Sequence, residues 1–129
     1  MSTDIGRRKR VLVLVEPNIR FSVGEGLTGM GYDFTTFEDS HRALHSIKHA
    51  VYDVVLIDYS KTRDNYPFVC DARQMGFSGP VILSTGDTHK FLERYPRALR
   101  DGIIDRILEK PFNYKELGKA LKEAIESRE

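Results

Sequence analysis

The segment Tyr52-Asp53-Val54-Val55-Leu56-Ile57-Asp58 decides the fold, because four apolar residues run directly into an aspartate. A continuous apolar run of this length is typical of a strand that is buried on both faces of a parallel sheet. Val11–Val15 has the same character, and Val81–Leu83 is a shorter version. The sequence therefore predicts a parallel sheet that is covered by helices on both sides.

The rest of the chain alternates between strand-like and helix-like segments. The further predicted strands are Tyr32–Phe37 and Arg106–Leu108. The predicted helices begin at Pro17, at Asp39 or Ser40, near Phe68, at Thr88 and at the capping pair Asn113 and Glu116. The helix over Thr88–Arg100 contains Pro96, which is expected to kink the helix or to start a new turn there. Five strands and five helices predict a single α/β domain of doubly wound topology.

The composition is that of one folded domain. Of 129 residues, 40% are hydrophobic and 30% are charged, which excludes a disordered chain and a membrane-spanning one. Lys and Arg number 20 against 19 Asp and Glu, which argues against nucleic acid as the main partner. The single cysteine, Cys70, and the absence of a secretion signal predict a cytoplasmic protein. Residues 1–10 form a basic segment that we interpret as a solvated N-terminal tail before a domain over 11–129.

Polar residues follow the predicted strands where each of them ends. The polar residues that follow four of the strands are Glu16, Asp58, the pair Ser84 and Thr85, and Lys110. Ligands of open parallel sheets gather at the carboxyl ends of the strands. Carboxylates, a hydroxyl and an ammonium at that edge suit a phosphoryl group and a metal better than an apolar ligand.

Four segments resemble the receiver domains of two-component response regulators. They are Val11–Leu14 with Glu16–Arg20, Tyr52–Asp58, Pro80–Gly86, and Glu109–Phe112 with Tyr114–Leu117. Each segment alone is a weak signal, but they occur in the family's order and at nearly its spacing. The resemblance implies a flavodoxin-like domain with strand order 2-1-3-4-5.

The resemblance also implies a phosphorylation switch. A sensor histidine kinase or a phosphotransfer protein would donate a phosphoryl group to Asp58, and Thr85 and Lys110 would contact the acyl phosphate. Mg²⁺ would be held by Glu16, Asp58 and the main-chain carbonyl of Ser60. Such a domain is not an enzyme and signals by binding a downstream protein; this chain carries no DNA-binding domain and no membrane segment.

The sequence departs from the family at the acids that hold the metal. Receiver domains carry two adjacent acids after the first strand, where this chain reads Leu14-Val15-Glu16-Pro17. Glu16 matches either the second acid or the residue after the pair, so at least one carboxylate is missing, and we expect weak Mg²⁺ binding. Ile107 replaces the family's aromatic switch residue, which predicts a muted or rerouted relay.

Two other functions are compatible with part of the sequence. The first is a degenerate pseudo-receiver that binds proteins without phosphorylation, which the depleted acidic pocket favours. The second is a phosphatase of the haloacid dehalogenase type, but Ser60 stands where that mechanism needs an acid. His41, His45 and His49 fall opposite the apolar face of their helix, so we interpret them as a solvent-exposed face rather than a metal site.

Overall fold

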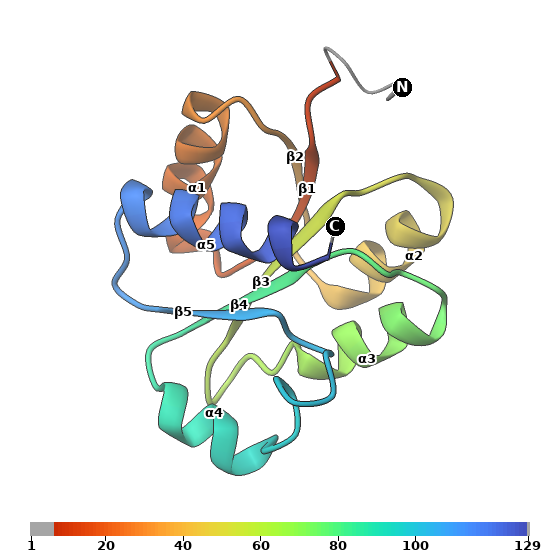
Figure 1. Cartoon of the computed structure of the whole chain (residues 1–129), viewed down its shortest axis with the longest axis vertical. Coiled ribbons are helices and arrows are strands. Elements are labelled where there is room, and N and C mark those ends of the chain that lie inside the picture. The colour runs from red at the N-terminus through yellow and green to blue at the C-terminus, as the bar shows by residue number, and fades with distance from the viewer. Residues whose placement is uncertain (1–6, 129) are drawn as a thin grey trace.

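The computed structural model describes residues 7–128 as a five-stranded parallel sheet in the order β2-β1-β3-β4-β5 (Figure 1). The strands are β1 (Arg10–Leu14), β2 (Asp33–Thr36), β3 (Val54–Tyr59), β4 (Val81–Thr85) and β5 (Arg106–Glu109). The helices are α1 (Pro17–Gly29), α2 (Ser40–His49), α3 (Tyr66–Gln74), α4 (Thr88–Arg94) and α5 (Tyr114–Ser127). The predicted fold class, strand order and number of helices are confirmed.

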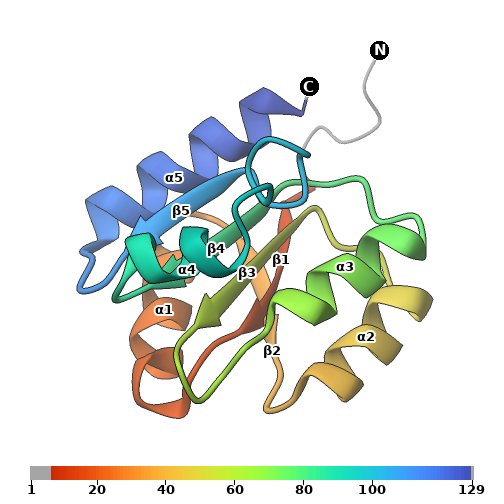
Figure 2. The same cartoon turned by 90° about the horizontal axis from the view of Figure 1, so that it is seen from below.

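Helices cover both faces of the sheet (Figure 2). The central strands β1, β3 and β4 contribute side chains to the apolar layers on both faces. α1 and α5 pack on one face, and α2, α3 and α4 pack on the other. Along β3, Val54 and Leu56 face α1 and α5, whereas Val55 and Ile57 face the opposite layer. This two-sided burial explains why the segment before Asp58 is apolar at every position.

Two glycines inside α1 make room for aromatic rings. A Cβ atom on Gly24 would lie 2.7 Å from Cζ of Phe34 on β2, and one on Gly26 would lie 2.7 Å from Cδ1 of Tyr114. Glycine in a helix interior costs roughly 0.5–1 kcal/mol relative to alanine. Here it allows the helix to approach its neighbours closely, so packing offsets the weak helix propensity.

The ends of α5 and α4 follow from local chemistry. Asn113 and Glu116 form the predicted capping box, in which each side chain accepts a hydrogen bond from the other residue's backbone N–H. α4 ends at Arg94, so the helix does not continue to Arg100; turns over residues 96–102 follow instead, in agreement with the predicted alternative of a new turn at Pro96. Pro96 has no N–H to donate and disfavours helical geometry in the residue before it, so it ends the helix instead of kinking it.

The predicted tail over 1–10 lies partly outside the described residues, which begin at residue 7. Arg10 already belongs to β1, and its N–H donates to Oδ2 of Asp53 at 2.8 Å. The Arg7 guanidinium donates to Oδ1 of the same carboxylate at 2.8 Å. Burial alone would raise the pKa of Asp53, but these two hydrogen bonds outweigh it and hold the pKa below its usual value. Within residues 7–128, no helix has the length and apolar character needed to cross a membrane.

Candidate functional site

The predicted site residues meet at the carboxyl-terminal edge of the sheet. Asp58 lies near the end of β3, Thr85 ends β4, and Lys110 directly follows β5. The Lys110 N–H donates to the Thr85 carbonyl oxygen at 2.8 Å, which fixes the two residues side by side. Glu16 follows β1, and its N–H donates to Oδ2 of Asp58 at 2.7 Å. Parallel pairing of four strands therefore brings residues from across the chain to one place.

Asp58 is buried at this edge, although a residue at the end of a strand is expected to be exposed. Its side chain is only 1% exposed. Oδ2 accepts the hydrogen bond from Glu16, and Oδ1 accepts one from Nδ2 of Asn65 at 2.9 Å. The same Asn65 nitrogen also donates to the Asp58 carbonyl oxygen at 2.9 Å. Both carboxylate oxygens are thus satisfied by the chain itself, as a buried charge requires.

Lys110 is the ammonium of the site and lies close to both acids. Its Nζ is 3.5 Å from Oδ2 of Asp58 and 3.4 Å from Oε1 of Glu16. The Lys110 side chain is 18% exposed, so water screens these ion pairs less than it would on an open surface. The arrangement provides a cation that can offset charge on a phosphoryl group at Asp58.

Thr85 lies on the wall of a cavity next to these charges. This cavity has a volume of about 420 Å³, and its lining includes Glu16, Ser60, Thr85 and Lys110. Thr85 is 2% exposed, and its Oγ1 accepts a hydrogen bond from the N–H of Asp87 at 3.2 Å. The cavity is therefore bordered by the hydroxyl and the ammonium that the sequence singled out.

Ser60 begins a tight turn after β3. Its N–H donates to the Arg63 carbonyl oxygen at 2.9 Å, and its own carbonyl oxygen accepts from the Arg63 N–H at 3.2 Å. The Ser60 hydroxyl accepts from the same N–H at 3.1 Å. The carbonyl that was predicted as a metal ligand is thus engaged in closing the turn.

Two residues of this loop belong to the site and were missed in the sequence. Asn65 binds Asp58 as described, and Nε of Arg63 lies 3.8 Å from Oδ1 of Asp58. Asn65 precedes α3, where its side chain would be expected to cap the helix, but it makes no cap hydrogen bond. Its position one residue before a helix is visible in the sequence, whereas its partner depends on how the loop folds.

Asp64 joins the same loop to the end of α4. Its Oδ2 accepts a hydrogen bond from the Tyr95 hydroxyl and lies 3.6 Å from Nε of Arg94. Its Oδ1 accepts from the Tyr66 N–H at 3.0 Å, which anchors the start of α3. The Tyr66 and Tyr95 rings stack with their centroids 4.1 Å apart. Loop, α3 and α4 are therefore connected by one carboxylate and a pair of aromatic rings.

The remaining reactive side chains form no second site among the described residues. Burial raises the pKa of Tyr66 to about 12, and the neighbouring Cys70 adds to that rise. Burial also raises the pKa of the Cys70 thiol, which makes it a poor nucleophile. His41, His45 and His49 are all exposed, as the helical spacing predicted.

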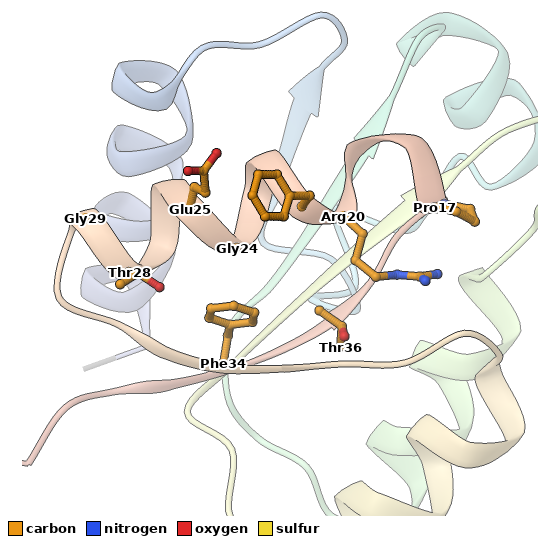
Figure 3. A pocket seen from close by; sticks show the side chains of 9 residues that line it. Pro17, Arg20, Gly24, Glu25, Thr28, Gly29, Phe34 and Thr36 are labelled. Carbon is orange, nitrogen blue, oxygen red and sulfur yellow. The ribbon is translucent and has the colours of Figure 1, made fainter.

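A larger hollow of about 720 Å³ lies between α1 and β2 (Figure 3). In this view the ring of Phe34 points from β2 toward α1 and lies below Gly24, between Thr28 and Thr36. The lining contains none of the predicted site residues. The polar chemistry thus belongs to the smaller cavity beside Asp58.

The chain is similar to solved receiver structures. It shares 30% identity with the response regulator TrrA of Thermotoga maritima, solved with Mg²⁺ and BeF, with a TM-score of 0.74 over 90% of this chain and 98% of that one. The chain belongs to the response-regulator receiver family. The signal receiver domain of an HD domain-containing protein from Pseudomonas fluorescens is 27% identical, with a TM-score of 0.80 over 95% of this chain and 98% of that one. The receiver domain of a sensor histidine kinase from Pseudomonas aeruginosa, solved with a magnesium ion in its active site cleft, is 23% identical, with a TM-score of 0.78 over 92% and 98%. No protein-family model matches the sequence, and no curated protein is significantly similar to it.

The strand register places the acids of this receiver domain. Leu14 on β1 pairs with Ile57 on β3, so Val15 stands level with Asp58 and Glu16 comes one residue later. In one of the two alignments open from the sequence, Glu16 takes the place of the second acid of the family's pair. Val15, which is 1% exposed and belongs to the core, then replaces the first acid.

The residues of this receiver domain do not fit a resident Mg²⁺ ion. Each predicted ligand is already engaged: Glu16 with Lys110, Asp58 with two N–H donors, and the Ser60 carbonyl with the N–H of Arg63. Within residues 7–128, no group of three or more His, Cys, Asp and Glu side chains is placed to hold a metal ion. Mg²⁺ needs free oxygen ligands in near-octahedral geometry. No chemical step is therefore assigned to the metal.

Proposed function

We propose that this receiver domain accepts a phosphoryl group on Asp58 and signals by binding a downstream protein. The donor would be a phosphohistidine on a sensor histidine kinase or on a phosphotransfer protein. The observation that carries the proposal is the position of Lys110, whose Nζ lies 3.5 Å from the Asp58 carboxylate at the wall of the cavity that Thr85 also lines. A carboxylate, a cation close to it and a hydroxyl on the wall of the neighbouring cavity are the groups that phosphoryl transfer to aspartate needs.

In the proposed step, a carboxylate oxygen of Asp58 attacks phosphorus and the P–N bond of the phosphohistidine breaks. The bonding electrons leave with the imidazole nitrogen, and Asp58 becomes an acyl phosphate. Lys110 then offsets the charge of the phosphoryl oxygens, and the Thr85 hydroxyl is placed to donate to one of them. The domain is modified once per signal and does not turn over a substrate, so we infer that it is not an enzyme.

We also infer that Mg²⁺ binds weakly. Glu16 and Asp58 are the carboxylates at the site, and both already have partners within the chain. A titration that shows tight binding, comparable to a site with three free carboxylates, would contradict this inference.

The test is labelling of the protein by phosphoramidate, followed by intact mass measurement. Wild-type protein should gain one phosphoryl group, and reduction of the product with borohydride should convert residue 58 to homoserine. Asp58→Asn should not be labelled, and Lys110→Met should be labelled more slowly. Circular dichroism of both variants checks that they are folded. Labelling that persists in Asp58→Asn would mean that another residue is the acceptor.

One observation favours the alternative function, a pseudo-receiver that binds proteins without phosphorylation. The Asp58 side chain is 1% exposed, and both of its oxygens accept hydrogen bonds from the chain. A phosphoryl donor can reach such a carboxylate only if the loop over residues 60–65 opens. A folded wild-type protein that no small phosphodonor labels would support the pseudo-receiver.

A further inference from the structure

Arg63 reaches back from the loop after β3 to the acceptor carboxylate. Its Nε lies 3.8 Å from Oδ1 of Asp58, and this buried nitrogen has no hydrogen-bond partner. Leaving a buried donor without a hydrogen-bond partner is unfavourable. Attraction to the carboxylate is the interaction in the structure that offsets this cost.

Two cations lie within 4 Å of the acids Asp58 and Glu16. Asp58 and Glu16 contribute two negative charges, and Lys110 and Arg63 contribute two positive ones. Lys110 approaches Oδ2 of Asp58 at 3.5 Å, and Arg63 approaches Oδ1 at 3.8 Å. A divalent cation at the carboxylate would be repelled from both sides.

The turn after β3 fixes where Arg63 lies. Both backbone groups of Arg63 are hydrogen-bonded to Ser60, as described, and two residues later Asn65 is bound to Asp58. The guanidinium therefore starts from a backbone that is held on both sides. A guanidinium is permanently charged and presents a planar set of donors that suits phosphate oxygens.

We propose that Arg63 takes the electrostatic place of the divalent cation in this receiver domain, so that Asp58 is phosphorylated without a metal. This rests on the proposed phosphoacceptor function. With phosphoramidate as donor, a carboxylate oxygen of Asp58 bonds to phosphorus, the P–N bond breaks, and ammonia leaves with the electron pair and the protons that its nitrogen carried. Arg63 offsets the negative charge that the phosphoryl group brings to the carboxylate.

The first arm of the test measures Mg²⁺ binding and does not need phosphorylation. Backbone amide shifts of Glu16 and Ser60 are followed by NMR during a titration with MgCl₂, for wild type, Arg63→Gln and the control Arg8→Gln. Arg8→Gln removes the same charge at the opposite end of the strands, where Nη1 of Arg8 lies 3.8 Å from Oδ1 of Asp33. Removal of one positive charge near 4 Å should tighten Mg²⁺ binding about tenfold in Arg63→Gln alone. Equal affinities in wild type and Arg63→Gln would overturn the proposal.

The second arm measures phosphoramidate labelling in EDTA and in MgCl₂. Wild type should be labelled at similar rates in both, whereas Arg63→Gln should be about tenfold slower in EDTA and should recover in MgCl₂. Arg63→Lys keeps the charge and should recover part of the rate in EDTA. Wild-type labelling that requires Mg²⁺ would overturn the proposal. If no variant is labelled while the titration behaves as expected, the phosphoacceptor function fails but the electrostatic role of Arg63 stands.

Discussion

Replacing Asp58 by asparagine should destabilise the fold by about 2–3 kcal/mol. The two carboxylate oxygens accept hydrogen bonds from the Glu16 N–H and from Nδ2 of Asn65. An asparagine offers one carbonyl oxygen, so one of these donors loses its acceptor, which costs about 1–3 kcal/mol when the donor is buried. Lost attraction to Lys110 and Arg63 adds less than about 1 kcal/mol, because both side chains are partly exposed and screened by water.

A competing effect has the opposite sign. Asparagine also removes the repulsion between the carboxylates of Asp58 and Glu16, and this repulsion alone would make the variant more stable. Lys110 lies within 3.5 Å of both acids, however, and therefore offsets the repulsion in the wild type. The unpaired donor should dominate, and the fold should survive because about 2–3 kcal/mol is less than the usual stability of a domain, about 5–15 kcal/mol.

Urea unfolding at pH 7, followed by circular dichroism, measures the effect. Asp58→Asn should lower the unfolding midpoint by about 1 M or more, at an unchanged slope. Asp39→Asn is the matched control, since Asp39 caps α2 by accepting from the Arg42 N–H and asparagine caps equally well. If Asp58→Asn is as stable as wild type or more stable, carboxylate repulsion outweighs the hydrogen bonds and the reasoning is refuted.

Three further predictions concern stability and pH. Gly24→Ala should destabilise the domain by about 1–2 kcal/mol, because the added Cβ meets the Phe34 ring. Gly29→Ala should be neutral or stabilise the domain, because no atom lies within 4 Å of its Cβ. Thermal melts of the two variants compare their stabilities. The pKa of Asp53 is lower in the folded state than its ordinary value of 3.8. The stability that the ionised Asp53 contributes is therefore present above pH 3.8 and is lost as the pH falls below 3.8. In acid unfolding curves, Asp53→Asn should lose less stability than wild type between pH 4 and pH 2. Because the folded-state pKa of Tyr66 is raised to about 12, its contribution is present below pH 10 and is lost as the pH rises toward 12. In urea unfolding, Tyr66→Phe should lose less stability than wild type between pH 9 and pH 12. A pH profile of stability equal to that of wild type would contradict the burial of the Tyr66 hydroxyl.

Most of the fold could be predicted because the buried strands carry their signal locally. Val54–Ile57 and Val11–Val15 are apolar at every position, which only a strand buried on both faces requires. The role of the glycines in α1 could not be predicted, since it depends on aromatic rings that lie far away in the sequence. The end of α4 could have been placed better, because the effect of Pro96 on the preceding residue is local.

The site could be predicted only where its residues lie in the last positions of strands or just after them. Asp58 and Lys110 are placed by the sheet: Asp58 follows the apolar run Val54–Ile57 within β3, and Lys110 directly follows β5. The burial of Asp58 and the approach of Arg63 depend on how the loop over residues 60–65 folds back. Such a fold is set by contacts between a turn, a helix start and a carboxylate, and no periodicity in the sequence reports them.

Arg63, Asp64 and Asn65 are consecutive, yet they face in two directions. Arg63 and Asn65 contact the acceptor carboxylate, and Asp64 between them holds Tyr95 at the end of α4. Neighbouring residues on one backbone cannot shift independently, so a bulkier group at residue 58 that pushes the loop outward also pulls on Asp64. The loop thus connects the acceptor carboxylate to the end of α4. We therefore expect the surface around α4 to respond to a change at Asp58 through this loop, even though an isoleucine stands at 107.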